Sequence, residues 1–199
     1  GGHTSAISAL QISATGGSNL LVNAAMSVTS DLYGGFANNA GVTGTFTARD
    51  LAAPDWLATG THSIGNAVNG NPTSGNLEMW WPAVPCEEGQ WYIAAAFCAA
   101  HRCIAQVGIR FYNEAGGLIE EVRSAGTTMT GGKNLANWSR QFVRRKAPSG
   151  ARRVECRVYQ QFNGGGNNPH AWFCRPSLEQ ATAAQTQPSP WAAGGAEWN

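Results

Sequence analysis

The sequence predicts an all-β fold, an antiparallel β-sandwich of the jelly-roll kind, and three observations support this. First, short stretches alternate apolar and polar residues with a period of two, which places successive side chains on opposite faces of a strand. Second, turns rich in Gly, Pro and Asn separate these stretches at regular spacing. Third, helix signals nearly vanish after residue 18, because Gly, Asn, Thr and Pro recur too often for long helices. A chain of 199 residues can hold one such domain with tails.

Three parts follow one another along the chain. Residues 1–17 are expected to be a short helical connector to an upstream region, because Ala6, Ile7 and Leu10 follow a helical spacing that Gly16-Gly17 ends. Residues 18–180 are expected to form the sandwich. Residues 181–199 are rich in Ala, Gln, Pro and Gly, and we expect an extended tail outside the core. The chain starts at Gly1, so we expect it to be a segment of a longer polypeptide.

The strands can be placed in order. Between residues 33 and 75 the composition indicates short strands separated by long loops, and from residue 77 the strands are clear. Residues 113–117 and 147–151 are turns, because they carry Gly, Asn and Pro where turns need them. The clear strands are expected at residues 77–81, 91–99, 103–112, 118–124, 138–146, 153–162 and 171–175.

The charge content narrows the classes of partner. Lys and Arg number 13 against 12 Asp and Glu, and only 13% of residues are charged, about half the usual share. Nucleic acids and anionic membranes are therefore poor candidates as partners. No apolar run approaches the roughly 20 residues that a spanning helix needs, so we expect a soluble domain without membrane insertion.

The chain has five cysteines, an odd number, and no C-x-x-C pair. Some of them lie inside apolar, strand-like runs, so we expect buried free thiols that behave as small hydrophobic side chains. A disulfide between Cys98 and Cys103, or a zinc site that includes His101, is the alternative interpretation.

A family resemblance rests on an ordered set of short motifs. They are Asn19-Leu20-Leu21-Val22-Asn23, Trp91-Tyr92-Ile93-Ala94-Ala95, Phe111-Tyr112-Asn113-Glu114-Ala115-Gly116, Trp138-Ser139-Arg140, Ala147-Pro148-Ser149-Gly150-Ala151 and Trp172-Phe173-Cys174-Arg175-Pro176-Ser177-Leu178-Glu179. In this order and spacing they resemble the family 4 and 9 carbohydrate-binding modules, which have the galactose-binding-like β-sandwich. The resemblance covers residues 19–179. It implies a carbohydrate-binding function.

The end of the chain carries a second resemblance. Residues 175–179, followed by residues 185–191, are similar to the ends of such modules in tailed-phage tail-tip, fibre and host-specificity proteins and in gene transfer agents. This implies a virion or extracellular adhesin that binds cell-surface glycan, with other tail subunits, or a homotrimer, as further partners. Many family members hold a structural calcium with an acidic residue in the last strand. Arg175 stands there in this chain, and because a cation repels a dication we expect no cofactor.

The candidate ligand-binding residues are planar or aromatic and share one predicted sheet face, because sugar hydroxyls need bidentate partners and sugar rings stack on aromatic rings. On two strands they are Gln106, Arg110 and Tyr112, and Arg157, Tyr159 and Gln161, with Gly108 leaving a gap between them. The stretch that matches the family's variable loops contains Trp56, His62, Trp80 and Trp81. Trp56 and Trp80 are candidate stacking platforms, and burial in the core is the alternative for each tryptophan. Trp91, Trp138 and Trp172 fall at strand starts and are expected in the core. The alternative is an ordinary solvated sheet face.

Signals of catalysis are thin. No G-x-S-x-G, H-E-x-x-H or P-loop motif occurs. The doublets Glu87-Glu88 and Glu120-Glu121 place their members on opposite faces of a strand, so neither doublet makes a glycosidase pair, although distant carboxylates could still pair. The sequence therefore predicts a non-catalytic, glycan-binding adhesin. A structural or oligomerisation module of a tail protein, and an accessory module of a polysaccharide-degrading enzyme, are the alternatives.

The arginines indicate a class of glycan. They gather on neighbouring strand candidates, which predicts a local basic face and favours an acidic surface polysaccharide. The arginines concerned are Arg110, Arg140, Arg144, Arg145, Arg153 and Arg157.

Overall fold

The computed structural model describes residues 19–21, 24, 35–38, 44–47, 62–66, 76–128, 135–162 and 169–191. The connector predicted for residues 1–17 lies outside the described residues, and so do Trp56 and residues 192–199. Within the described part, helix is limited to the short 3-10 element η3 (Leu135–Asn137). No helix among these residues is long and apolar enough to cross a membrane.

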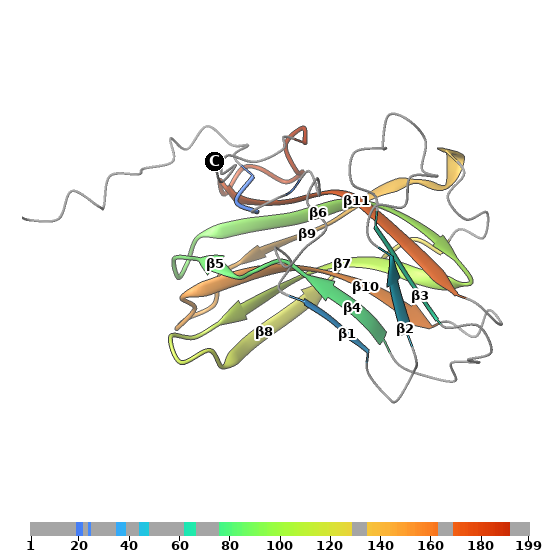
Figure 1. Cartoon of the computed structure of the whole chain (residues 1–199). Helices are drawn as coiled ribbons and strands as arrows, with labels where there is room; N and C mark the ends of the chain where they lie inside the picture. The colour runs from blue at the N-terminus through green and yellow to red at the C-terminus, as the bar shows by residue number, and fades with distance from the viewer. Residues whose placement is uncertain are drawn as a thin grey trace, which may run out of the picture.

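Two antiparallel sheets pack face to face, as Figure 1 shows. The first sheet has the order β1-β4-β10-β7-β8, with β5 paired to β10, and the second has the order β2-β3-β11-β6-β9. The first contains β1 (Gly35–Asn38), β4 (Asn76–Trp80), β5 (Val84–Pro85), β7 (Cys103–Tyr112), β8 (Leu118–Arg123) and β10 (Arg153–Phe162). The second contains β2 (Gly44–Thr47), β3 (His62–Asn66), β6 (Trp91–His101), β9 (Ser139–Lys146) and β11 (His170–Ala181). The predicted all-β antiparallel sandwich is confirmed.

The period-two alternation of β7 and β10 decides which side chains enter the core. Val107 pairs with Val158, and Ile109 pairs with Cys156, and all four are fully buried between the sheets. The residues between them therefore point to the outer face of the first sheet. The face that the sequence predicted for ligand binding is this outer face.

Strand β11 is longer than the sequence predicted, because a bulge lets it continue past a proline. Its pairing with β6 shifts between Cys174 and Ser177 and then resumes to Ala181. Arg175 lies in the bulge with a φ of 48°, in the left-handed region. Pro176 has no N–H to give to a ladder and would normally end pairing, and the bulge accommodates it.

Two tryptophans that the sequence placed in the core lie on the outer face of the second sheet. Trp91 is partly buried beneath the Arg144 guanidinium, 3.6 Å from its ring centre, and Trp172 stacks on His170. Each alternates with a core residue of its own strand, so the pleat turns it outward. Trp138 is partly buried and packs against the core.

All five cysteines are buried free thiols, as expected for small hydrophobic side chains. Cys98 and Cys103 are not bonded to each other. Burial raises the pKa of Cys86 to about 11 and that of Cys103 to about 12. A thiol must become a thiolate to react, so both burial and the raised pKa protect these side chains.

Thiol labelling tests this arrangement. At pH 8 the native protein is expected to react with a thiol reagent far more slowly than a free cysteine does, whereas the unfolded protein should react at all five positions. An aromatic disulfide reagent releases a chromophore when it reacts with a thiol. Its absorbance with and without guanidinium chloride gives the number of reactive thiols in the unfolded and in the native protein. Fast labelling of even one thiol in the native protein would contradict the burial described above.

Candidate functional site

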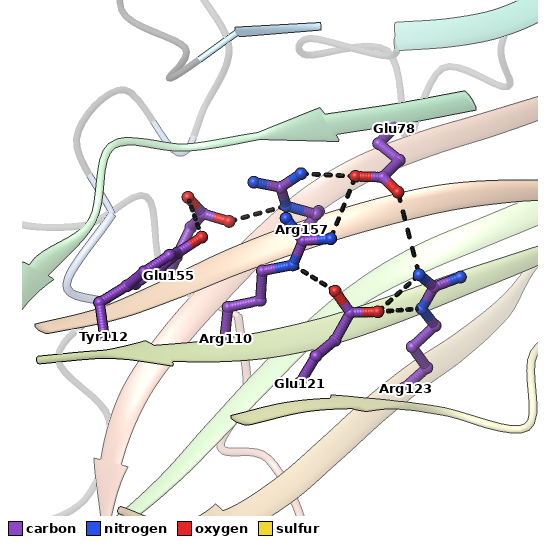
Figure 2. A network of polar contacts seen from close by, with 7 residues as sticks. All are labelled: Glu78, Arg110, Tyr112, Glu121, Arg123, Glu155 and Arg157. Atoms are coloured by element: carbon purple, nitrogen blue, oxygen red, sulfur yellow. Dashed lines mark hydrogen bonds and ion pairs between the residues drawn. The ribbon is translucent and has the colours of Figure 1, made fainter. Parts of the chain in front are cut away.

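A network of charged side chains covers the outer face of the first sheet. Figure 2 shows its seven residues, which come from four adjacent strands. We call it the outer-face network, and its members are Glu78 of β4, Arg110 and Tyr112 of β7, Glu121 and Arg123 of β8, and Glu155 and Arg157 of β10. They meet because pairing sets Arg110 between Glu155 on one side and Glu121 on the other.

Arg157 is the buried centre of this network. Its Nε donates to Glu155 at 2.7 Å, and its Nη1 donates to Glu78. The side chains of Arg157, Glu155 and Glu78 are 7%, 7% and 4% exposed, so all three charges are almost withdrawn from water. Buried charges are stable only when they are paired and hydrogen-bonded, and each of these is. The Tyr112 hydroxyl donates to the second oxygen of Glu155 at 3.2 Å.

The second half of the network lies nearer to solvent. Arg110 donates through Nε to Glu121 and through Nη2 to Glu78 at 3.3 Å. Arg123 donates through Nε to Glu121 at 2.6 Å, and its Nη2 lies 3.9 Å from a Glu78 oxygen. Glu78 therefore contacts three arginines, Arg157 included, and Glu121 contacts two. The planar groups are held in fixed orientations by one another.

The charges of the outer-face network cancel, because three arginines face three glutamates. The expectation of one local basic face is wrong. Arg140 and Arg144 lie on β9, in the other sheet, where they bind carbonyl groups of the chain after β11. Arg145 pairs with Glu120. Strand order separated residues that are close in sequence.

Tyr159 fills the gap that Gly108 leaves. A Cβ at position 108 would lie 2.5 Å from the Tyr159 ring, so only glycine allows the ring to lie there. The Arg123 guanidinium covers the ring at 3.8 Å from its centre, and Tyr159 is fully buried. Among the described residues, the Tyr159 hydroxyl and the Gln106 side-chain oxygen have no hydrogen-bond partner. Tyr159 thus forms a floor beneath Arg123.

Trp80 extends the same face onto β4. It pairs with Arg157, whose guanidinium lies 4.3 Å from the Trp80 ring centre, and the indole is partly buried. Gln161 lies four residues beyond Arg157 on the same face and is also partly buried. Trp56 lies outside the described residues. The structure brings the other seven predicted site residues onto one sheet face, and these are Trp80, Gln106, Arg110, Tyr112, Arg157, Tyr159 and Gln161.

Sequence reasoning missed the acidic half of the site. Glu78, Glu121 and Glu155 were not predicted as site residues, and neither was Arg123. Their positions in the alternation of β4, β8 and β10 were a usable signal, because that alternation places them on the outer face. Alternation within a strand does not show which strands lie side by side, so it could not reveal that β4, β10, β7 and β8 are neighbours.

The pKa values of Glu155 and Glu121 are shifted in opposite directions. Burial raises the pKa of Glu155 above its ordinary value of 4.5, although Arg157 opposes this. Burial also acts to raise the pKa of Glu121, but Arg123 and Arg110 outweigh it, and the pKa falls below 4.5. The partly solvated carboxylate is therefore held ionised by its two arginines.

A Glu121→Gln variant tests the electrostatic part of this pairing. Because folding lowers the pKa of Glu121, its contribution to stability is present above about pH 4.5 and is lost as the pH falls through the lower, folded-state pKa. We expect the variant to be less stable by about 1 kcal/mol at pH 7, with the difference shrinking below pH 4. Urea unfolding at several pH values measures this, with Glu114→Gln in an exposed turn as the control. A difference independent of pH would contradict the ion pairs.

The described residues do not fit the calcium site of the resembled family. Arg175 occupies the bulge, and the Pro176 carbonyl accepts hydrogen bonds from the Asn19 side-chain amide at 2.9 Å and from the Trp191 indole at 3.0 Å. Protein donors thus occupy this carbonyl oxygen. Within the described part of the chain, no three His, Cys, Asp or Glu side chains gather as a metal site.

Comparison of the sequence with known families and curated proteins identifies no related protein. No known family model matches the chain, and no curated protein matches it.

Comparison of the fold finds a phage tail protein and carbohydrate-binding modules. The enzymatically active domain of tailspike protein 4 of bacteriophage CBA120 is similar with a TM-score of 0.60 and 13% identity, over 81% of this chain and 21% of that chain. This chain therefore spans about a fifth of the tailspike chain. A family 16 carbohydrate-binding module is similar with a TM-score of 0.47 and 14% identity, over 80% of this chain and 99% of that one. TmCBM61 in complex with β-1,4-galactotriose is similar with a TM-score of 0.47 and 12% identity, over 81% and 98%. At these identities the likeness is one of fold, and the chain is a β-sandwich whose structural neighbours include carbohydrate-binding modules and one phage tailspike.

Proposed function

We propose that this chain is a non-catalytic glycan-binding module that binds a cell-surface polysaccharide on the outer face of the first sheet. The observation that carries the proposal is the outer-face network beside the indole of Trp80. It presents planar guanidinium and carboxylate groups in fixed orientations next to an aromatic ring, on one sheet face.

Sugar recognition suits this arrangement for a physical reason. A sugar hydroxyl both donates and accepts, so a surface with alternating carboxylates and guanidinia offers it both partners. The less polar face of a sugar ring packs on an aromatic ring such as Trp80. Because the charged groups already hold one another in place, little conformational freedom remains to be lost when a ligand binds. Arg110, Glu121 and Arg123, which are 18%, 20% and 25% exposed, are the members of the network that a glycan can reach.

The same contacts argue for binding rather than hydrolysis. A glycosidase uses one carboxylic acid to give up a proton and a second carboxylate to act on the sugar or on water. Glu155 has the raised pKa of an acid, but its oxygens are buried and accept from Arg157 and Tyr112. Glu121 is held by Arg110 and Arg123, which lower its pKa and favour the ionised form. The oxygens of Glu78 contact three arginines in a buried position.

The setting that we propose is the tip of a phage-like tail, where the module serves in host recognition alongside other tail subunits. The support is the sequence resemblance at residues 175–179 and 185–191, together with the fold likeness to a bacteriophage tailspike. In this setting the protein is on the virion, or outside the cell.

A binding assay with matched tryptophan variants tests the proposed function. The full chain is applied to a glycan array and to polysaccharide purified from candidate hosts, and Trp80→Ala is expected to weaken binding roughly tenfold. Trp172→Ala is the control, because Trp172 is also partly buried but lies on the other sheet. Absence of any glycan ligand, or equal loss in both variants, would refute the proposal.

A second candidate function is supported by the tip of the β7–β8 hairpin. Leu118 and Ile119 are 54% and 38% exposed, and they are the exposed large hydrophobic residues of the described part of the chain. An apolar pair at a hairpin tip suits contact with a neighbouring subunit. Light scattering tests an oligomerisation module: a stable oligomer that Leu118→Ser separates would favour it, and a monomer at all concentrations would exclude it.

A further inference from the structure

We propose that residues 182–191, which we call the C-terminal clasp, are a structural part of the sandwich and close one outer face of the second sheet. The sequence placed these residues in an extended tail outside the core. The contacts described next instead bind them to β9 and β11, and Figure 1 shows the chain after β11 folding back along the outer side of the second sheet. This inference does not depend on the proposed glycan binding.

Two arginines of β9 bind the backbone of the clasp. Arg144 donates through Nε to the Gln185 carbonyl at 2.6 Å and through Nη2 to the Ala183 carbonyl at 2.7 Å. Arg140 donates to the Ser189 carbonyl at 2.6 Å. Hydrogen bonds from charged donors are stronger than those from neutral ones, so the backbone is fixed at both ends of the segment.

The aromatic rings of β6 set the positions of these arginines. Trp91 lies 3.6 Å from the Arg144 guanidinium, and Phe97 lies 5.9 Å from that of Arg140. A guanidinium that stacks on an aromatic ring keeps its in-plane N–H groups available as donors. The same face of β6 therefore supports both contacts.

Strand β11 holds the far end of the clasp. The Ser189 amide donates to Glu179 at 2.7 Å, and Glu179 is buried. The Trp191 indole donates to the Pro176 carbonyl at 3.0 Å, and the Arg175 guanidinium lies 5.3 Å from the Trp191 ring centre. The bulge of β11 thus provides a fixed attachment for the last described residue.

The sequence of the clasp explains why its backbone is bound by arginine side chains and not by a neighbouring strand. Pro188 and Pro190 have no N–H, so this segment cannot add to the sheet as a regular strand. The chain bends at residues 183, 184 and 187, and the Gln185 amide donates to the Thr182 carbonyl at 3.2 Å. Guanidinium groups from β9 can bind the backbone carbonyls of the clasp without the regular hydrogen bonds of paired strands.

Burial on the outer side of β6 supports a structural role for the clasp. Ile93 and Ala95 alternate with the core residues Tyr92, Ala94 and Ala96 and so belong to the outer side of β6, yet both are 0% exposed. An uncovered outer face would leave them in contact with water. We infer that the folding unit extends through Trp191 and does not stop near residue 180.

An Arg144→Gln variant of the full chain tests the clasp, with Arg145→Gln as its matched control. Arg145 is the next residue on β9 and pairs with Glu120 at the surface, with its own side chain 48% exposed. We expect Arg144→Gln to lower Tm by about 4 °C or more and Arg145→Gln to lower it by less than about 2 °C. The Ser189 amide should exchange with solvent at least roughly tenfold faster in Arg144→Gln only.

Truncation gives a second, independent measurement. A chain ending at residue 181 is expected to melt lower than a chain ending at residue 191 and to bind an apolar fluorescent dye, because the outer side of β6 is uncovered. Equal melting of the two chains, or fast exchange of the Ser189 amide in the parent protein, would overturn the proposal. Glycan binding is measured separately, and its loss or retention has no bearing on this result.

Discussion

Replacing Arg157 by methionine is expected to lower the free energy of unfolding by about 3–5 kcal/mol, the largest effect that the outer-face network predicts. The side chain is 7% exposed and donates to both Glu155 and Glu78. Removing it leaves two buried carboxylates without their shared partner and also removes the stack on Trp80. Urea unfolding followed by circular dichroism measures the loss.

Two further variants separate charge pairing from a general effect of mutation. Arg153 lies on the same strand and face as Arg157 but is exposed. We expect Arg153→Met to change the free energy of unfolding by less than about 0.5 kcal/mol. Adding Glu155→Leu to Arg157→Met should restore part of the lost stability, because one of the unpaired charges is then gone. An Arg157→Met variant within 1 kcal/mol of the parent would show that these carboxylates do not depend on the guanidinium.

The Tyr159→Ala variant is expected to lower the free energy of unfolding by about 3–5 kcal/mol, the value typical of deleting a large, fully buried ring. The lost ring fills the space over Gly108 and supports Arg123, so the variant leaves a cavity below the network. Tyr159→Phe should change stability by less than about 1 kcal/mol, since the hydroxyl has no hydrogen-bond partner among the described residues. Urea unfolding of both variants measures the difference.

The phenylalanine variant also tests how Tyr159 serves the site. We expect it to keep glycan binding, because we propose that the ring acts by holding Arg123 in position and that the buried hydroxyl does not reach the ligand. Loss of binding with unchanged stability would instead make the hydroxyl a direct contact. A large loss of stability in the phenylalanine variant would contradict the absence of a partner for that hydroxyl.

The outward direction of the predicted site residues could be read from sequence. In β7 and β10 small and apolar residues alternate with Gln, Arg and Tyr, and the pleat of a strand converts this pattern directly into two faces. Gln106, Arg110, Arg157 and Tyr159 share a face for this reason. The extent of exposure was not readable, because Tyr159 is covered by a residue from β8.

The charge pairing could not be read from sequence. Arg157 and Glu78 are separated by 79 positions along the chain, and Arg110 and Glu121 are brought together by the β7–β8 register. The expectation of a basic face was wrong because closeness in sequence is not closeness in space. Arg144 and Arg157 are near in sequence but lie in different sheets. An electrostatic interaction depends on distance in space, and strand order sets that distance.

The sequence by itself determined the fold class, the positions of β4, β6, β7, β8, β9 and β10, the burial of the cysteines and the sides of β7 and β10 that face the core. These properties follow from local patterns with a period of two and from turn residues, which act over a few positions. Only the tertiary structure decided that the arginines of one face are neutralised by glutamates and that residues 182–191 bind back onto β9. Both results depend on contacts between segments far apart in the chain, and chain folding alone brings those segments together.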